Sequence, residues 1–362
     1  MDTTLFTGTG TRMIPQQVRG QSPHGTSRKG ISANTTCSSK IRMQNDVPQR
    51  ILVTGGAGFI GSHTIDLLLQ EERQVIVLDN LSTGKLENLN LTHPNLEFIE
   101  GDVLEYPLVE DLLDQCDAVL HLAAISSVQQ SIENPVYTFQ VNTQGLLHVL
   151  QAMRKLKKTI RLAFASSAAV YGEMNQLPCR DDLPLAGIPL SPYALQKRHD
   201  EDYANLYGRL FGIQSLALRY FNVYGKRQDP LSPYSGVISR FLSAYQKEEK
   251  VTIFGDGKQS RDFIHVADVA RANWLALKSD FNGVLNIATG LPQTLLDLIK
   301  YLEAAGNKVV KLQFEAAKKG DIKSSYAAIS MALEHLQFKA EIPLNEGIKS
   351  LIVSYPEDIG SP

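Results

Sequence analysis

The stretch Ile51-Leu-Val-Thr-Gly-Gly-Ala-Gly-Phe-Ile-Gly61 decides the fold. It begins with a short apolar run, continues through Gly55, Gly58 and Gly61 at three-residue spacing, and leads into a helical pattern that reaches Gln70. Glycine allows a tight turn and lets a phosphate approach the backbone closely. The start of the following helix offers unpaired N–H groups and a partial positive charge. The stretch therefore predicts a strand, a phosphate-binding turn and a helix.

Short, mostly apolar runs recur downstream of this stretch, with helical patterns between several of them. They cover residues 75–78, 96–99, 118–122, 161–164 and 216–219. Such runs are typical of strands buried on both faces, as in a parallel sheet covered by helices. The alternation predicts an α/β fold with a doubly wound parallel sheet, the Rossmann architecture.

The pattern loosens after Tyr224 and predicts a second, smaller domain. We expect a Rossmann domain of residues 49–224 plus 263–290, and a discontinuous C-terminal domain of residues 225–262 plus 291–355. Helical patterns cover residues 237–247 and 262–277, and strand patterns cover 251–254 and 283–288.

Residues 1–48 are rich in Ser, Thr, Gly, Gln and Arg, poor in acids and without apolar periodicity. Three interpretations stay open: a disordered tail, an upstream start codon with Met43 as the working start, or an organelle transit peptide. None of the three affects the chemistry predicted for the rest of the chain.

Charge and composition exclude several classes of function. The formal net charge of −2 provides no basic field for nucleic acid, and no run approaches the ~18 apolar residues of a membrane span. The three cysteines are widely spaced, match no zinc pattern and favour a reducing compartment such as the cytoplasm. The eight histidines form no ligand cluster, so no metal is expected, and His121 is interpreted as a core or strand-end residue.

Asp79 ends the second apolar run, about 20 residues beyond the middle glycine of the turn. A carboxylate there accepts hydrogen bonds from the adenosine ribose and repels a 2′-phosphate. The next residue is Asn80 and not arginine, so the bound dinucleotide is predicted to be NAD. Asp102 follows the third run and is either a partner for the adenine amino group or a simple loop aspartate.

Ser191-Pro-Tyr193-Ala-Leu-Gln-Lys197 predicts the start of a helix, because serine suits the N-cap and proline the first helical position. Tyr193 and Lys197 then share one face. An ammonium beside a phenol favours the phenolate, so Tyr193 is a candidate general base. Ser166 and Ser167 end the run 161–164, at the sheet edge where open α/β sheets bind ligands, and either hydroxyl could bond the substrate oxygen.

These motifs resemble those of the extended short-chain dehydrogenase/reductases and, among them, the nucleotide-sugar 4-epimerases. The resemblance runs from about Ile51 to Tyr355. The matching segments are Thr54–Gly61, His121-Leu-Ala-Ala124, Asn142-Thr-Gln-Gly145, Ser166–Gly172, Tyr193-x-x-x-Lys197, Arg219-Tyr-Phe-Asn-Val-Tyr-Gly225 and Gly257-Lys-Gln-Ser-Arg-Asp-Phe-Ile-His265.

The resemblance implies that Tyr193 is the general base, that Lys197 positions it together with the nicotinamide ribose, and that Ser167 bonds the reacting hydroxyl. The NAD-binding residues implied are Gly55, Gly58, Phe59, Ile60, Gly61, Asp79, Asn80, Asp102, Val103, Leu122, Ala123, Ala124, Asn142, Tyr193, Lys197 and Tyr220. The second domain is implied to bind the sugar nucleotide.

The sugar-nucleotide contacts implied are Ser126, Ser127, Ser166, Ser167, Tyr193, Asn222 near the diphosphate, Phe254 beside the uracil, Arg261 on a phosphate, Lys318 and Ser325. Many relatives place arginine in the late segment that reads Lys318-Lys-Gly-Asp321 here. The compact ammonium of lysine therefore stands where those relatives have a forked guanidinium. Ser325 stands where relatives restricted to unacetylated sugars have a bulky residue. Its small side chain favours an N-acetylated hexose.

Ala168 and Ala169 stand where 4,6-dehydratases of the superfamily carry Asp and Glu. The resemblance therefore implies a UDP-hexose 4-epimerase that oxidises and re-reduces carbon 4 with tightly bound NAD. UDP-N-acetylglucosamine and its galacto epimer are the favoured substrates, UDP-glucose and UDP-galactose the second pair, and a homodimer the expected assembly. Two alternatives stay open: a net NAD-dependent nucleotide-sugar oxidoreductase, and a non-catalytic NAD-binding sensor or scaffold.

Overall fold

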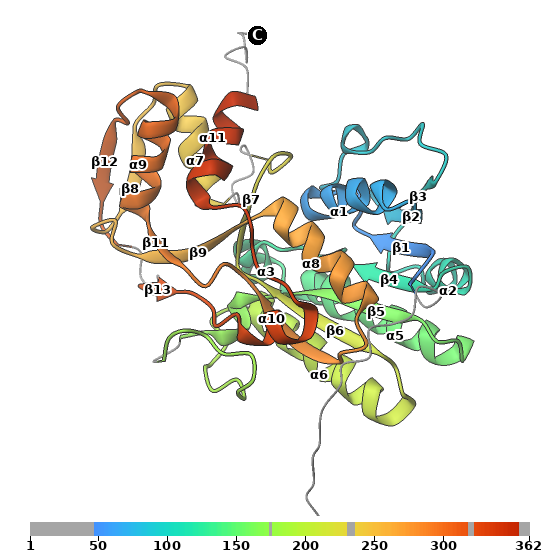
Figure 1. Ribbon diagram of the computed structural model, residues 1–362. Coiled ribbons are helices and arrows are strands. Elements are labelled where there is room, and N and C mark those ends of the chain that lie inside the picture. Colours follow the sequence, from blue (N-terminus) through green and yellow to red (C-terminus); the bar gives the residue numbers. More distant parts are fainter. Residues whose placement is uncertain (1–46, 174–175, 230–235, 318–321, 355–362) are drawn as a thin grey trace, which may run out of the picture. The chain divides into compact units, whose positions relative to one another are not determined.

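A seven-stranded parallel sheet forms the core of the structure, a computed structural model that describes residues 47–173, 176–229, 236–317 and 322–354 (Figure 1). All described residues lie in the unit Ile41–Pro362. In spatial order the strands are β10 (Gly283–Ile287), β6 (Ser215–Tyr220), β5 (Arg161–Ser167), β4 (Ala118–His121), β1 (Arg50–Thr54), β2 (Gln74–Asp79) and β3 (Leu96–Glu100). Every neighbouring pair is parallel, which confirms the predicted α/β fold class.

Helices cover both faces of the sheet, and successive residues of β1 show why apolar residues follow one another along a strand of this sheet. Ile51 and Val53 pack into the cluster on one face, and Leu52 packs into the cluster on the other. The first face is covered by α1 (Phe59–Gln70), α8 (Val266–Lys278) and α10 (Ser330–Leu336), and the second by α2 (Tyr106–Asp114), α5 (Gly145–Leu156) and α6 (Pro192–Phe211).

The strand order reverses between β1 and β4. From β1 the chain continues outward to β2 and β3, whereas β4 leads to β5 and β6 on the other side. Loops that leave the carboxyl ends of β1 and β4 therefore diverge, and open α/β sheets bind their ligands in the crevice formed at such a point.

Short helical segments connect the strands near this crevice. They are η2 (Leu86–Asn88), α3 (Val128–Glu133), α4 (Pro135–Phe139), the π-helical segment η3 (Gln140–Gln144) and η4 (Ala168–Tyr171). In the described part of the chain, no helix is long and apolar enough to cross a membrane.

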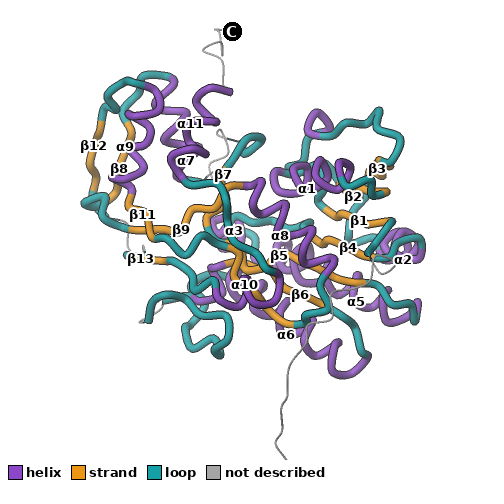
Figure 2. The backbone as a smooth tube through the Cα atoms, viewed as in Figure 1, coloured by secondary structure: helices purple, strands orange, loops and turns teal. Residues whose placement is uncertain are grey.

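A second group of elements packs around its own apolar cluster, which includes Phe241, Ile253 and Leu298. Figure 2 shows the backbone of this group. Its strands are β7 (Asn222–Tyr224), β8 (Val251–Phe254), β9 (Ser260–His265), β11 (Pro292–Thr294), β12 (Leu312–Glu315) and β13 (Ser324–Ser325). Its helices are α7 (Val237–Gln246), α9 (Leu295–Gly306) and α11 (Leu344–Ser354).

The predicted helix over residues 262–277 is shorter in the structure. Residues 262–265 are not helical, because they belong to β9, which pairs with β7, β11 and β13. The helix begins at Val266, where the side chain of His265 caps it by accepting a hydrogen bond from the Ala267 N–H. Strands β11, β12 and β13 were not among the predicted elements, because their two to four residues are too short to show a period.

Candidate active site

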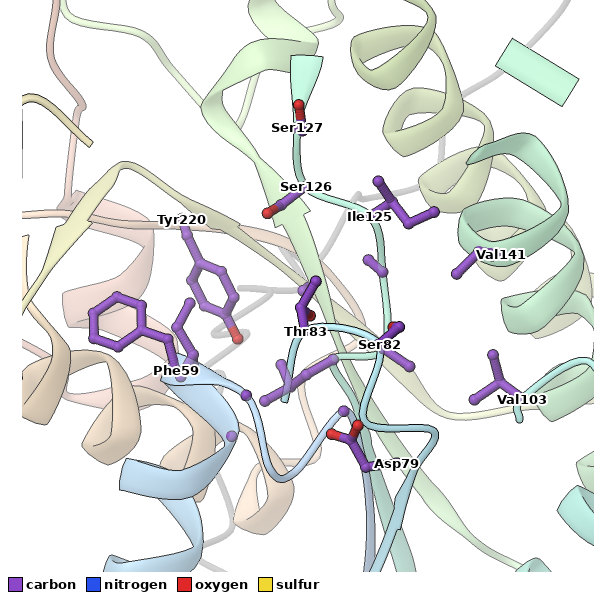
Figure 3. A pocket seen from close by; sticks show the side chains of 18 of the residues that line it. Phe59, Asp79, Ser82, Thr83, Val103, Ile125, Ser126, Ser127, Val141 and Tyr220 are labelled. Carbon is purple, nitrogen blue, oxygen red and sulfur yellow. The ribbon is translucent and has the colours of Figure 1, made fainter. Parts of the chain in front are cut away.

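A cleft of about 460 Å³ lies at the carboxyl ends of the central strands (Figure 3). Among the described residues that line it are the phosphate-binding turn, the acids after β2 and β3, the serines that end β5, and the tyrosine and lysine of α6. The predicted residues that line it are Gly55, Gly58, Phe59, Ile60, Gly61, Asp79, Asn80, Asp102, Val103, Leu122, Ala123, Ala124, Ser126, Ser127, Ser166, Ser167, Tyr193, Lys197 and Tyr220. Motifs far apart in the sequence therefore meet at one place.

Further residues line the cleft that the sequence did not single out. They are Leu78, Ser82, Thr83, Lys85, Asn88, Gly101, Ile125, Gln130, Tyr137, Val141, Ala165, Phe221, Val223, Arg227, Gln228, Asp229 and Gly236. Most lie in or next to loops that follow β2, β4, β5 and β6. Their position after the parallel strands is the sequence signal from which they could have been predicted.

The glycine turn has the backbone geometry that its sequence predicts. Gly55 has a φ of 68°, and a Cβ there would lie 2.7 Å from the backbone nitrogen of Ala123. A Cβ on Gly61 would lie 2.4 Å from the carbonyl oxygen of Gly55. The turn is therefore closed on itself and presents the N-terminus of α1 to the cleft, which suits a pyrophosphate.

Asp79 is held at the end of β2 by two backbone hydrogen bonds. Its Oδ2 accepts from the Ala57 N–H at 2.9 Å, and its Oδ1 accepts from the Leu81 N–H at 2.8 Å. Burial raises the pKa of Asp79, and these two hydrogen bonds oppose that shift. The carboxylate lies beside the glycine turn in Figure 3, in position to accept from a ribose.

Asn80 and Asp102 contact each other across the ends of β2 and β3. The Asn80 amide donates to Oδ2 of Asp102 at 2.8 Å, and Oδ1 of Asp102 accepts from the Leu104 N–H at 2.9 Å. Asp102 thus stabilises its own loop and also lines the cleft, so both interpretations of this residue fit the geometry.

Tyr193 lies in the first turn of α6 and is fixed from two sides. Oγ of Ser191 caps the helix by accepting from the Ala194 N–H, as the sequence predicted. The Tyr193 N–H donates to the hydroxyl of Ser131, a fully buried residue of α3, at 3.0 Å. A second helix therefore sets the backbone position of the candidate base.

Lys197 forms an ion pair that the sequence analysis missed. Its Nζ lies 3.2 Å from Oδ2 of Asp200, and both side chains are almost completely buried. Asp200 follows Lys197 by three positions on α6, so the helical period places both on one face. The sequence contained this signal, but it did not show that the face is buried.

The two serines that end β5 differ in their hydrogen bonds. Ser166 donates to Oε1 of Glu201 at 2.5 Å, and Glu201 also accepts from Arg219 at 2.8 and 2.7 Å. Oγ of Ser167 accepts from the Ala169 N–H at 3.2 Å, which leaves its O–H available to donate. Ser167 is therefore the better placed of the two to donate to a substrate oxygen.

The loop after β4 is held by Asn142, which does not itself line the cleft. The Asn142 amide accepts from the Ile125 N–H at 2.7 Å and donates to the Ile125 carbonyl and to Gln196. Ser127 caps α3 by accepting from the Gln130 N–H at 3.0 Å. Asn142 thus positions the segment that borders the cleft.

His121 ends β4 inside the core. Its Nδ1 lies 2.8 Å from the hydroxyl of Thr54. Burial, with a contribution from the Lys197 charge, lowers the pKa of His121 to about 3. The imidazole is therefore neutral near pH 7, in accord with a core or strand-end residue.

Four predicted sugar-nucleotide residues lie outside this cleft, in the second group of elements. Asn222 donates to the Asp262 carbonyl, Phe254 ends β8, and Arg261 donates to the Ser260 carbonyl and pairs in register with Ser325 of β13. Lys318 lies outside the described residues.

The sequence of this sheet and its site matches a known family. Residues 51–288 match the NAD dependent epimerase/dehydratase family. The chain belongs to this family. The match covers the glycine turn, both serines of β5 and the Tyr193–Lys197 pair. The predicted family resemblance is therefore confirmed.

Several relatives are similar to this chain over most of its length. A Methanocaldococcus jannaschii protein named as a candidate UDP-glucose 4-epimerase is 43% identical over 307 residues, 83% of this chain and 97% of its own. UDP-N-acetylglucosamine 4-epimerase from Methanobrevibacter ruminantium, solved with UDP-N-acetylmuramic acid, is 39% identical with a TM-score of 0.80, over 85% of this chain and 99% of its own. UDP-glucose 4-epimerase from Thermus thermophilus, solved with NAD, is 36% identical with a TM-score of 0.76, over 84% and 98%.

The cofactor of this epimerase/dehydratase is NAD. The residues present fit it, because the closed glycine turn faces the cleft and the buried Asp79 carboxylate lies beside it. The substrate class of its relatives is UDP-sugars.

Proposed function

We propose that this protein is a 4-epimerase that inverts carbon 4 of a UDP-hexose, with UDP-N-acetylglucosamine and UDP-N-acetylgalactosamine as its substrates. One observation carries the proposal: a single cleft joins the dinucleotide turn to Ser167, Tyr193 and Lys197. Ala168 and Ala169 follow Ser167, so no carboxylate stands there to move protons at carbons 5 and 6.

Three side chains carry the chemistry in this proposal. NAD, when bound, supplies the acceptor for the carbon 4 hydride and returns it. Tyr193 takes the proton from the substrate O4 and later gives it back, as a general base and acid. Ser167 donates to the same oxygen, and Lys197 holds the nicotinamide ribose and stabilises the negative charge on the phenol.

The acetylated substrate is favoured by the small side chains around the expected sugar position. Ser126 lines the cleft, and Ser325 stands in register with Arg261, the proposed phosphate partner. The Methanobrevibacter relative acts on UDP-N-acetylglucosamine. We propose that Phe254 and Asn222 contact the uridine diphosphate, that residues 225–262 and 291–355 form the domain that holds it, and that residues 49–224 and 263–290 form the NAD domain.

Incubation of the purified protein with UDP-N-acetylglucosamine tests this function. The expected result is the galacto epimer, detected by NMR, without consumption of added NADH. Stoichiometric NADH consumption would identify a net oxidoreductase, and release of carbon dioxide from a UDP-uronate would identify a decarboxylase. Absence of product from both acetylated and plain UDP-hexoses would refute the proposal.

We also propose a cytoplasmic homodimer. Ile132, Val136 and Leu210, from α3, α4 and α6, are 54%, 72% and 62% exposed, and a second copy could bury them. Cys116 and Cys179 are buried free thiols, in keeping with a reducing compartment. Sedimentation equilibrium checks the assembly: a dimer that Val136→Glu converts to a monomer supports this interface.

A further inference from the structure

The buried pair of Lys197 and Asp200 is a feature that the proposed reaction leaves unused. The lysine lines the cleft, whereas the aspartate is absent from the described lining residues. The ammonium lies 3.2 Å from Oδ2 of Asp200, and the two side chains are 3% and 1% exposed. A carboxylate thus contacts the ammonium from inside the protein, where water screens the charges little.

Two ionisable groups near Asp200, His121 and Glu201, do not take the place of Lys197 as its ion-pair partner. His121, whose pKa is lowered to about 3, is neutral near pH 7. Glu201, the next residue, is occupied by Arg219 and Ser166. Burial raises the pKa of Asp200, the charge of Glu201 adds to that shift, and the Lys197 ammonium is the main opposing influence, followed by the Thr143 hydroxyl.

We propose that Asp200 is a positioning residue that fixes Lys197 and offsets its charge, and thereby sets the relative affinity of the cleft for NAD and NADH. The nicotinamide ring is cationic in NAD and neutral in NADH. An unbalanced ammonium beside the ring therefore lowers the affinity for the oxidised form, NAD. A carboxylate paired with the ammonium offsets its charge and restores that affinity. This inference rests on the proposed function for the placement of Lys197 at the nicotinamide ribose.

Asp200→Asn tests the inference, because it keeps the shape of the side chain and removes its charge. The purified protein is equilibrated with mixtures of NAD and NADH without any UDP-sugar. Free dinucleotide is removed, and the bound NADH share is read from its near-ultraviolet absorbance. A unit charge within ~10 Å at an effective dielectric constant of ~20 changes such a ratio about tenfold, so the NADH/NAD affinity ratio should rise about tenfold.

Asp268→Asn is the matched control. Asp268 is also a buried carboxylate paired at i,i+3 with a cation, Arg271, at 3.0 Å, but it is not among the cleft-lining residues. This variant should lose stability without changing the NADH/NAD ratio. A folded Asp200→Asn protein that binds both dinucleotides in the wild-type ratio would overturn the inference.

Lys197→Met gives a second test with the opposite sign, and it decides the matter if Asp200→Asn does not fold. Without the ammonium, the carboxylate favours the cationic ring, so the bound NADH share should fall below that of the wild type. A rise or an unchanged share overturns the inference. Because no sugar is present, these outcomes do not depend on whether the protein epimerises any UDP-hexose.

Discussion

Replacement of Glu201 by glutamine should destabilise the protein strongly. The Glu201 carboxylate accepts two hydrogen bonds from Arg219, at 2.8 and 2.7 Å, and both side chains are at most 6% exposed. Burial opposes the charge of Arg219, but the hydrogen bonds and charge of Glu201, together with Tyr171, outweigh it and raise the pKa of the guanidinium. Glutamine removes the opposing charge and turns an amide N–H₂ toward a cation.

The magnitude follows from the burial of this pair. Loss of one partner from a buried ion pair costs about 3–5 kcal/mol, because the other charge stays buried without compensation. For a chain of roughly 300 ordered residues, this corresponds to a fall in melting temperature of roughly 5–8 °C. Ser166 also loses the carboxylate that accepts a hydrogen bond from its hydroxyl at 2.5 Å, so the end of β5 should become less ordered.

Urea unfolding and thermal denaturation of the wild type and Glu201→Gln measure the change in the free energy of unfolding. Glu97→Gln is the control, because Glu97 pairs with Arg50 on the surface with side chains 53% and 34% exposed. A surface pair of this kind contributes about 0–1 kcal/mol. If Glu201→Gln costs no more than the control, the buried pair does not hold the end of β5 as argued.

Three further predictions concern single side chains. Tyr193→Phe should lower kcat roughly 10²–10⁴-fold with NAD binding retained. Tyr203→Phe, at a half-exposed position of the same helix, should leave kcat unchanged. Equal rates of the two variants in a kinetic assay would exclude Tyr193 as the base. Asp79→Asn should weaken NAD binding roughly 10- to 150-fold and reduce the preference over NADP, since hydrogen bonds to a charged group are worth ~1.5–3 kcal/mol. Fluorescence titration with both dinucleotides checks this, and an unchanged preference contradicts it. His121 has a pKa of about 3 in the folded protein and ~6.5 when unfolded, so stability should fall by up to ~1.4 kcal/mol per pH unit as pH drops through that window. His121→Asn should reduce this dependence of the free energy of unfolding on pH, measured by urea unfolding at a series of acid pH values. The same dependence in the wild type and the variant would show that the folded imidazole is protonated.

The sequence predicted those features that depend on local spacing. Gly55 and Gly61 sit in a turn whose backbone geometry excludes other residues, and Asp79 ends a strand whose residues 75–78 are all apolar. Tyr193 and Lys197 share a helix face that Ser191 caps. Each of these signals lies within a few residues, and physical chemistry links it directly to a conformation.

Partners that come from distant segments could not be predicted in the same way. Nothing in the sequence pairs Ser131 with the Tyr193 N–H or Asn142 with Ile125, because these contacts depend on how helices dock on the sheet. Strand β9 was missed for a related reason. Its pairing with β7, β11 and β13 overrides an apolar pattern that continues into the next helix.

The hydrogen bond between Ser131 and Tyr193 links two walls of the cleft. Ser127, the N-cap of α3, borders the cleft, and Ser131 of the same helix holds the backbone of the candidate base. An insertion in the segment after β4 would therefore displace Tyr193 together with the wall that we propose faces the sugar. Under the proposed function, we expect exchange of a side chain such as Ser126 to change the substrate range more readily than a change in the length of that segment.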